Sequence, residues 1–246
     1  MKKMLLNCDL GESYGSWTMG LDDAVMPFID QANIACGFHG GDPLTIRRTL
    51  ALAKEHGVTV GAHPAYPDLV GFGRRSMNLA SDELAAAVLY QIAVIDGMAS
   101  TEGTELKYVK PHGALYNDMM RDATVRTTII QAIANYHRPI ALMLQATPNA
   151  GEHRDEARSQ GIEVLFEAFA DRCYDDDGAL LARSKAGAVH NRDKMLAQVK
   201  QVRDRGTVIT VSGHTIELAV DTLCVHGDNA EGVAAIRQIR ALVDGE

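Results

Sequence analysis

Ionisable side chains that could do acid–base chemistry recur in this sequence directly after short apolar stretches. Five of them, which we predict to be catalytic, are Asp9, Glu12, His63, Lys110 and His112. Carboxylates and imidazoles can accept or donate protons, and an ammonium group can stabilise a developing negative charge. A site with all three kinds of group has the means to hold an anion, to activate water and to protonate a leaving group.

A second group of charged residues could bind an anionic substrate or a phosphate. It consists of Arg74, Arg75, Glu167, Asp171, Arg172, His226 and Asp228. In the GFGRR segment (residues 71–75), small glycines would let backbone N–H groups approach an oxyanion while an arginine completes the charge. On spacing alone, this segment could equally be a loop with solvated arginines. Glu167 and the Asp171–Arg172 pair could instead form an internal ion pair, since a buried carboxylate needs a partner.

A divalent metal ion could also be bound. Asp9, His39 and His63 supply one carboxylate and two imidazoles from successive strand ends, which could make a facial site with open positions. The two histidines belong to separate loops, without the i, i+4 spacing on a helix that would bring them together. The distances between these three residues are therefore not fixed by the sequence.

Eight short segments rich in apolar and β-branched residues predict the strands that would position these side chains. They are Met4–Asp9, Asn33–Phe38, Val58–Ala62, Lys107–Lys110, Pro139–Leu144, Glu163–Phe169, Thr207–Val211 and Thr222–His226. Several lack an alternation of apolar and polar residues, as is typical of parallel strands that are buried on both faces. We therefore expect a barrel or sheet of seven or eight mostly parallel strands.

Longer stretches with helical periodicity lie between these strands. Asp42 and Pro43 suit the cap and first position of a helix that Gly57 would end. Ser81, followed by two acidic residues, predicts the capped start of a second helix that would run toward Gly97. Further helices are expected to begin near Asp122, Asn149, Asn191 and Asn229.

Strands that alternate with helices predict an α/β protein, and we favour a distorted TIM-like barrel. No repeat or linker divides the chain, so we expect residues 1–246 to form a single barrel domain. In such barrels the active site lies at the carboxyl ends of the strands, where the ionisable residues are predicted to fall. A purely structural interpretation remains open, in which Asp9, Asp42 and Asp228 cap helices and His63 or His112 satisfies a buried carbonyl group.

The composition argues against several classes of function. The chain contains 24 Lys and Arg against 32 Asp and Glu, a formal net charge of −8, without the clustered basic stripe that nucleic acid requires. The initial MKK is followed by too few apolar residues for a signal peptide, and we expect no membrane-spanning segment. The four cysteines form no CxxC pair, so we expect reduced thiols and a cytoplasmic protein. His56, His137, His153 and His190 are predicted to lie on the solvated surface.

Separated sequence blocks, in order along nearly the whole chain, resemble the LamB/YcsF family. They are NCDLGE (7–12), ANIACGFH (32–39), GAHP (61–64), YPD and GFGRR (66–68 and 71–75), VKPHGALYN (109–117), EAFADR (167–172) and CVHGD (224–228). Ala65 and Gly40 depart from the usual family residues, but neither changes a chemical group. Several long blocks are far more specific than a lone glycine motif.

This resemblance implies a barrel similar to those of the glycoside hydrolase/deacetylase superfamily. It also implies hydrolysis of 5-oxoproline to glutamate, with ATP and Mg²⁺ used, together with two further 5-oxoprolinase subunits of the B and C types. Coupling to ATP has a chemical reason, because an unstrained lactam is a poor electrophile and phosphorylation of its oxygen creates a leaving group. The sequence contains neither GxxxxGK[ST] nor a GxGxxG that opens a helix, so ATP would bind to a partner subunit or to an unfamiliar site here.

For such a reaction we predict three roles among these residues. Lys110, with Arg75 or Arg172, would hold anionic groups. One of the two carboxylates after the first strand would activate water, and His63 or His112 would shuttle a proton. Two alternatives remain open: a metal-dependent amidohydrolase or deacetylase that acts without ATP, and a non-catalytic subunit that only binds the lactam.

Overall fold

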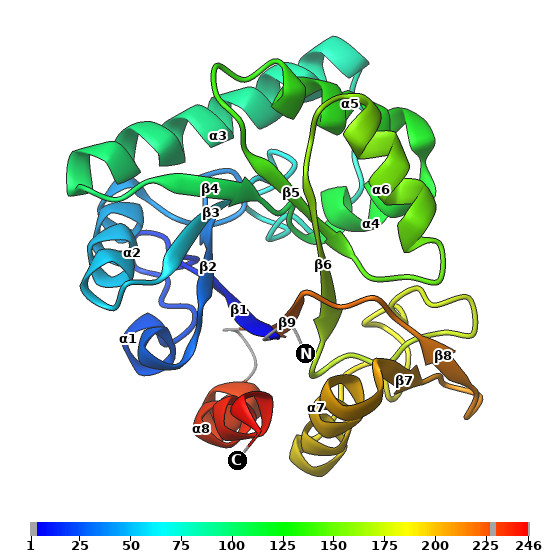
Figure 1. The fold of residues 1–246 in the computed structure, drawn as a ribbon. Helices are drawn as coiled ribbons and strands as arrows, with labels where there is room; N and C mark the ends of the chain where they lie inside the picture. Colours follow the sequence, from blue (N-terminus) through cyan, green and yellow to red (C-terminus); the bar gives the residue numbers. More distant parts are fainter. Residues whose placement is uncertain (1–3, 227–229, 246) are drawn as a thin grey trace.

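Seven parallel strands form a closed barrel at the centre of the protein (Figure 1). The computed structural model describes residues 4–226 and 230–245. The barrel strands are β1 (Leu5–Leu10), β2 (Gln31–Ala35), β3 (Thr59–His63), β4 (Leu106–Val109), β5 (Ala141–Gln145), β6 (Val164–Phe169) and β9 (Thr222–His226). They pair in this order, and β9 closes the barrel between β6 and β1. The predicted α/β class and TIM-like barrel are confirmed.

One of the eight predicted strands does not belong to the barrel. Thr207–Val211 forms β7 (Thr207–Ile209), which pairs antiparallel with β8 (Thr215–Glu217) in a separate two-stranded sheet. Ile209 and Val211 are about half exposed, at 50% and 55%, as expected for a small sheet outside the barrel. The partner strand is only a few residues away, so this pairing closes a very short loop.

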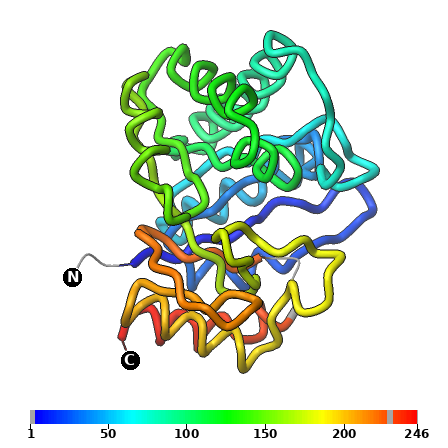
Figure 2. Tube along the Cα trace, turned by 90° about the vertical axis from the view of Figure 1, so that its right-hand side faces the viewer, coloured from blue at the N-terminus to red at the C-terminus, as the bar shows by residue number. Residues whose placement is uncertain are grey.

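Helices cover the outside of the barrel (Figure 1). They are α1 (Asp22–Val25), η1 (Met26–Phe28), α2 (Pro43–Glu55), α3 (Ser81–Glu102), α4 (Gly113–Arg121), α5 (Ala123–Ala134), α6 (Ala150–Ser159), α7 (Arg192–Arg205) and α8 (Ala230–Asp244). The last helix packs against α7, so the segment between β6 and β9, yellow to orange in Figure 2, lies beside the end of the chain.

Side-chain caps confirm several predicted helix starts. Asp42 accepts hydrogen bonds from the backbone N–H groups at the start of α2, and Pro43 occupies its first turn. Asp122 and Asn191 cap α5 and α7 in the same way. Helix α6 follows Asn149, whose side chain makes no capping hydrogen bond. The predicted start at Asn229 lies outside the described residues.

Helix α3 differs from its prediction at both ends. Ser81 is the first helical residue and not a cap, and the helix continues through Gly97 to Glu102. It ends at Gly103, whose φ of 74° is the left-handed conformation that glycine adopts readily. Gly97 is tolerated because buried neighbours such as Ile95 anchor the helix on both sides of it.

Helix α3 also corrects the expectation that no segment is long and apolar enough to cross a membrane. By length and composition alone, Ser81–Glu102 meets that test. One side of the helix buries Leu84, Val88, Ile92 and Ile95, and it packs against β3, β4, α2 and α5. These contacts account for its apolar composition as a helix that covers the barrel.

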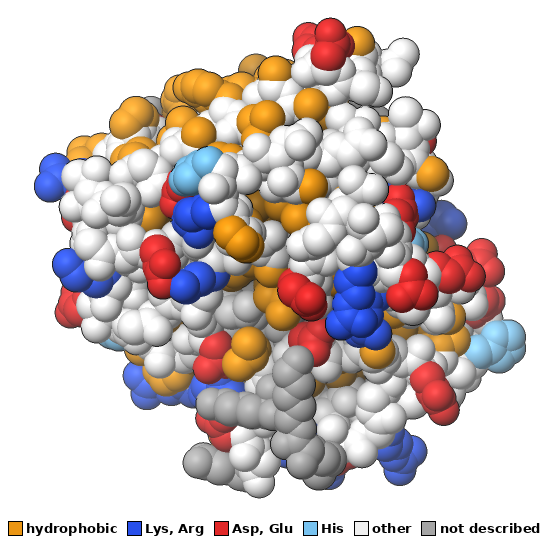
Figure 3. Space-filling model, turned by 45° about the horizontal axis from the view of Figure 1, so that its top comes forward, with side chains coloured by type: hydrophobic (Ala, Val, Ile, Leu, Met, Phe, Trp, Pro, Cys, Tyr) orange, Lys and Arg blue, Asp and Glu red, His pale blue; other side chains and the backbone are white. Residues whose placement is uncertain are grey.

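Charges of both signs are interspersed over the face shown in Figure 3. Within the described residues, some ion pairs join elements that are separated in sequence. Arg240 Nη1 of α8 lies 2.6 Å from Asp30 Oδ2, just before β2, and Arg126 Nε of α5 lies 2.6 Å from Glu156 Oε2 of α6. Partly exposed pairs of this kind each contribute little stability, so the barrel depends mainly on its apolar core.

Replacing Gly61 with alanine is expected to lower the free energy of unfolding by about 1–3 kcal/mol. A Cβ atom at this position of β3 would overlap Cε2 of the buried Tyr108 ring. Tyr108 cannot move away freely, because its hydroxyl donates a 2.6 Å hydrogen bond to Asn33 Oδ1. Urea unfolding measures the effect, with Gly97→Ala as the control, since Gly97 has open space around it. Equal stability of Gly61→Ala and the wild type would contradict this account.

Candidate active site

Lys110 lies at the centre of a buried network of charges. Its Nζ atom is 2.8 Å from Asp9 Oδ1, 3.0 Å from Glu167 Oε2 and 3.2 Å from Cys224 Sγ. Burial opposes the charged form of Lys110, but these three neighbours outweigh it and raise the pKa of Lys110 well above its ordinary value. Burial likewise opposes the charged form of Asp9, but His63 and Lys110 hold its pKa well below the usual range. The network therefore contains a true ammonium–carboxylate pair.

Two asparagines fix the orientation of Asp9. Asn33 Nδ2 donates to Asp9 Oδ1 and to Asn7 Oδ1, both at 2.8 Å. Asn7 Nδ2 in turn donates to Thr222 Oγ1 at 3.0 Å, so the chain of hydrogen bonds runs from β2 through β1 to β9. No role was predicted for these asparagines. The signal that could have identified them is an amide side chain inside an otherwise apolar strand, because a buried amide must find partners.

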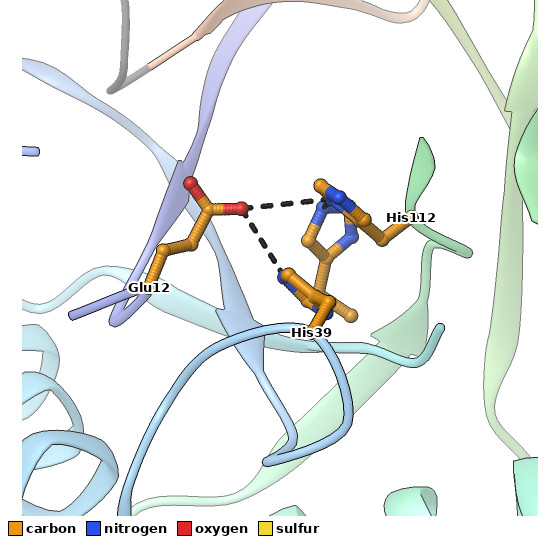
Figure 4. Close-up of side chains that lie close together, drawn as sticks. Glu12, His39 and His112 are labelled. Carbon is orange, nitrogen blue, oxygen red and sulfur yellow. Dashed lines mark hydrogen bonds and ion pairs between the residues drawn. The ribbon is translucent and has the colours of Figure 1, made fainter. Parts of the chain in front are cut away.

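Glu12, His39, His63 and His112 form a second buried cluster beside Asp9. Glu12 Oε1 lies 3.2 Å from His39 Nε2 and 3.6 Å from His112 Nδ1, and Figure 4 shows the carboxylate pointing toward both rings. His63 Nε2 is 2.9 Å from His112 Nδ1 and 3.3 Å from Asp9 Oδ2. The His39 and His112 rings are stacked, with centroids 3.7 Å apart and planes 4° from parallel. Burial holds the pKa of both His39 and His112 well below the ordinary value.

The loops after β3 and β4 hold two of these imidazoles in place. His63 is the last residue of β3, and its Nδ1 donates to the Lys110 carbonyl at 2.6 Å. His112 precedes α4, and its Nε2 donates to the Phe72 carbonyl at 2.9 Å. Phe72 has a φ of 54°, an uncommon conformation for a bulky residue, at the point where its carbonyl meets the ring. At Gly113 a Cβ would lie 2.5 Å from a backbone oxygen of the β3–α3 loop, so no side chain fits.

Asp171 and His226 form a hydrogen-bonded pair in the same region. His226 Nδ1 lies 2.9 and 3.1 Å from the two Asp171 oxygens, and Asp171 is completely buried. The Phe169 ring stacks on His226 with centroids 5.6 Å apart. The carboxylate accepts the Nδ1 proton, which leaves Nε2 as the nitrogen that can accept a proton. An imidazole oriented in this way by a buried carboxylate is suited to act as a general base.

A pocket of about 290 Å³ connects these groups with solvent. Asp9, Glu12, His63, Lys110 and His226 are among the residues that line it. Four arginines also line it within the described part of the chain, namely Arg74, Arg121, Arg172 and Arg183. The pocket therefore combines a buried ammonium, carboxylates and imidazoles with guanidinium groups, a combination suited to a small anionic substrate.

The structure corrects the prediction for the GFGRR segment. The N–H groups of Gly71, Phe72 and Gly73 already donate to Asp68 Oδ1, the Leu69 carbonyl and the Asp68 carbonyl, so they do not form an anion-binding loop. The Arg75 side chain is 63% exposed and pairs with buried Asp68, and Arg75 does not line the pocket. Its neighbour Arg74 does line the pocket.

The remaining predicted residues do not all lie at the pocket. Arg172 lines the pocket, and its guanidinium also donates to the Leu181 and Ala188 carbonyls at 2.7 and 3.3 Å. Burial and nearby Arg183 lower the pKa of Arg172 to about 10. Asp228 lies outside the described residues. Of the four histidines predicted at the surface, His56 and His137 are exposed, whereas His153 and His190 are half-buried.

Two sets of side chains in the described ranges could hold a cation. One contains Glu12, His39, His63 and His112, and the other contains Asp9, Cys224 and His226; within each set the ligand atoms lie within 4.8 Å of one another. For the phosphates of a nucleotide, the pocket arginines are suitable partners. Arg121 also lines a neighbouring pocket of about 150 Å³, which includes Gln145, Thr147 and His153.

Comparisons with known proteins cover nearly the whole chain. The model of the LamB/YcsF family matches residues 4–246. A protein named as an A-type 5-oxoprolinase subunit from Chromohalobacter salexigens is 53% identical over 98% of this chain and 97% of its own, and a second one, from Pseudomonas putida, is 51% identical over 100% and 95%. The crystal structure of a lactam utilization protein from Thermus thermophilus has a TM-score of 0.89 at 39% identity, covering 99% of this chain and 96% of that one.

Proposed function

Because this chain belongs to the LamB/YcsF family, we propose that it is the A-type component of a 5-oxoprolinase. In this function it would open the lactam of 5-oxoproline to glutamate, with ATP converted to ADP and phosphate, in a complex with partner subunits of the B and C types. The names of relatives that are about half identical support this assignment. The structural observation that carries it is the pocket itself, in which the buried Lys110 ammonium and four arginines face a space suited to a small anion.

The charges suggest how the substrate would lie. The carboxylate of 5-oxoproline would pair with a pocket guanidinium such as Arg74, since arginine holds carboxylates through two parallel hydrogen bonds. The lactam oxygen would then lie toward Lys110, whose ammonium group can stabilise negative charge or a transferred phosphoryl group. In total, 5-oxoproline, ATP and two waters would give glutamate, ADP and phosphate.

Proton transfers in this reaction have candidate residues on the pocket wall. His226, oriented by Asp171, would accept a proton from the attacking water. The lactam nitrogen must gain a proton when the C–N bond breaks, and His63 and His112, which also line the pocket, are the other imidazoles that could supply it in a metal-free site. Mg²⁺ would enter with ATP, and this chain or a partner subunit would bind the nucleotide.

A reconstitution assay tests this function. The chain would be incubated with 5-oxoproline, ATP and Mg²⁺, alone and with candidate partner subunits, while glutamate and ADP are measured together. Coupled release of both only with partners supports the proposal. Amide hydrolysis without ATP would favour a metal-dependent amidohydrolase or deacetylase, and full turnover by complexes carrying Asp9→Asn or His112→Ala would favour a subunit that only binds the lactam. No lactam opening in any combination would overturn the assignment.

Replacing Arg74 with alanine is expected to raise the KM for 5-oxoproline about 10- to 100-fold, which is the order expected when charge-assisted hydrogen bonds to the substrate carboxylate are lost. The reason is that Arg74 lines the pocket and carries the charge that would meet the substrate carboxylate. Arg75→Ala is the matched control, because Arg75 pairs with Asp68 outside the pocket. Steady-state kinetics of the reconstituted complex would measure both. A larger KM effect for Arg75→Ala would show that the substrate binds elsewhere.

A further inference from the structure

The protons on two neighbouring imidazoles are fixed by backbone carbonyl groups. A carbonyl oxygen only accepts hydrogen bonds, so His63 Nδ1, at 2.6 Å from the Lys110 carbonyl, must carry a hydrogen. By the same argument His112 Nε2, at 2.9 Å from the Phe72 carbonyl, must carry one. In the neutral form each imidazole has only one hydrogen on nitrogen. Neutral rings would therefore carry lone pairs, without hydrogens, on His63 Nε2 and His112 Nδ1.

These two lone pairs face each other. His63 Nε2 and His112 Nδ1 are 2.9 Å apart, which is hydrogen-bond distance, yet neither nitrogen of the neutral rings has a hydrogen to donate. Two carboxylate oxygens lie beside these lone pairs and add negative charge. Asp9 Oδ2 is 3.3 Å from His63 Nε2, and Glu12 Oε1 is 3.6 Å from His112 Nδ1. Buried acceptors without a donor between them are unfavourable. A positive species must therefore lie among these atoms.

The separations of these atoms fit a metal ion. Bonds of about 2.0–2.1 Å in a tetrahedral site place neighbouring ligand atoms about 3.3 Å apart. Two separations, 2.9 Å from His63 Nε2 to His112 Nδ1 and 3.6 Å from Glu12 Oε1 to His112 Nδ1, lie on both sides of this value, and the Glu12 and His63 ligand atoms lie within 4.8 Å of each other. The His63 and His112 rings are 86° from parallel, so both ring planes can contain one common point between the two nitrogens.

His39 belongs to the cluster but is poorly placed to bind the same ion. The lone pair of an imidazole nitrogen lies in the ring plane, and the His39 and His112 planes are nearly parallel with centroids 3.7 Å apart. One ion cannot lie in both planes. His39 Nε2 is instead 3.2 Å from Glu12 Oε1, where it can donate a hydrogen bond that orients the carboxylate.

We propose that Glu12, His63 and His112 bind one divalent transition-metal ion, with His39 as a positioning residue. Two imidazoles and a carboxylate are the donor set that Zn²⁺, Fe²⁺, Mn²⁺ and related ions prefer, and three protein ligands leave a position open toward the pocket. This set replaces the expected Asp9, His39 and His63. Asp9 is held by Lys110 and Asn33 through Oδ1, so we assign it to the Lys110 network although its Oδ2 lies beside the site. His39 is excluded by its stacking on His112. An ion bound here would supply Lewis acidity beside Lys110.

Metal binding by the chain alone tests the proposal, without any assay of activity. The purified full chain would be stripped with a chelator, and calorimetry would follow titration with Zn²⁺ and Co²⁺, with elemental analysis of the unstripped chain. We expect one ion per chain and, for Co²⁺, a visible absorption band from nitrogen ligands. His63→Ala and His112→Ala should each weaken binding at least about 100-fold, and His39→Gln about 10- to 100-fold.

Matched variants separate the site from incidental binding. Glu12→Gln keeps the shape of the side chain but removes the charged ligand, so it should weaken binding even if an alanine variant fails to fold. His137→Ala removes an exposed histidine and should bind as the wild type does. Circular dichroism would confirm that each variant is folded. Equal binding by wild type, His112→Ala and Glu12→Gln, or loss of binding in His137→Ala alone, would overturn the site.

The proposal and the proposed lactam activity can fail separately. A stripped wild type that binds neither ion would show that a proton, shared by His63 and His112, supplies the positive charge, and would overturn the metal site. If that metal-free chain still opened 5-oxoproline with ATP and partner subunits, the proposed function would stand. Conversely, an intact metal site in a chain without 5-oxoprolinase activity would support only the present inference.

Discussion

Replacing Lys110 with methionine is expected to abolish lactam opening and to lower the free energy of unfolding by about 3–5 kcal/mol at neutral pH. Methionine keeps the length and apolar body of the side chain but removes the ammonium group that Asp9 and Glu167 share. Both carboxylates are buried, at 5% and 0% exposure, so the variant would leave two like charges in the interior without their common partner. The reaction would also lose the cation nearest to the expected lactam oxygen.

The pH dependence of stability provides the sharpest readout of this variant. In the wild type the pKa of Asp9 is held below its usual range, so its stabilising contribution is present above the unfolded-state pKa and is lost as the pH falls through the folded-state pKa. In Lys110→Met, Asp9 loses this cation, so the pKa of Asp9 must rise. The difference from wild type should therefore be largest at neutral pH and shrink in acid.

Denaturant unfolding at neutral and mildly acidic pH would measure this difference. Lys107→Met is the control, because Lys107 lies on β4, which directly precedes Lys110, and its side chain is 53% exposed. Its stability should change by less than about 1 kcal/mol. If Lys110→Met lost no more stability than Lys107→Met, the buried charge network would not have the role assigned to it.

The second large effect is expected for Asp171→Asn, which should lower the kcat of the reconstituted enzyme about 10³- to 10⁴-fold. The carboxylate fixes the His226 proton on Nδ1 and would stabilise the imidazolium ion that forms when Nε2 accepts a proton. The amide of asparagine carries no negative charge to stabilise the imidazolium ion, and its NH₂ group could donate to Nδ1 and so move the proton of the neutral ring to Nε2. The KM for 5-oxoproline should change little, since Asp171 does not line the pocket.

The pH profile of kcat distinguishes this role from a structural one. A general base should make the wild-type rate depend on pH, and the asparagine variant should lose that dependence. Asp176→Asn is a suitable control, because Asp176 pairs with Thr210 at the surface. A variant of Asp171 that kept its rate and its pH profile would assign base catalysis to another group.

The barrel itself could be predicted because its strands carry a local signal. Four of the five residues of β5 are apolar and its last four are buried, and such apolar runs are typical of parallel strands covered by helices. Thr207–Val211 has the same local character, and only tertiary pairing with β8 separates it from the barrel. Gly97 was predicted to lie at the end of a helix, but α3 continues through it to Glu102. Glycine costs about 1 kcal/mol in a helix, which is small beside the stabilisation that α3 gains from packing on the barrel.

The sequence indicated which types of residue lie near the candidate site, but not which way their side chains point. Arg74 and Arg75 are adjacent and identical, and Asp68, for which no role was predicted, turns one away from the pocket. Asn33 and Cys224 were not among the predicted site residues, because neither carries a formal charge, yet both contact the Asp9–Lys110 pair. The facing lone pairs of His63 and His112 result from the positions of the Lys110 and Phe72 carbonyl groups. The spacing of residues in the sequence does not reveal these positions.

The way in which β9 closes the barrel also bears on how this protein is made. Leu5 of β1 pairs with Thr222 of β9, so the first strand to leave the ribosome obtains its second neighbour only when nearly the whole chain has been synthesised. Until then β1 and β6 each present an open edge of unpaired backbone groups, which is a template for pairing with other chains. Contacts of such long sequence separation also slow folding. Nascent chains that stop before β9 should therefore aggregate readily and depend on chaperones, even though every predicted site histidine except His226 has already been synthesised.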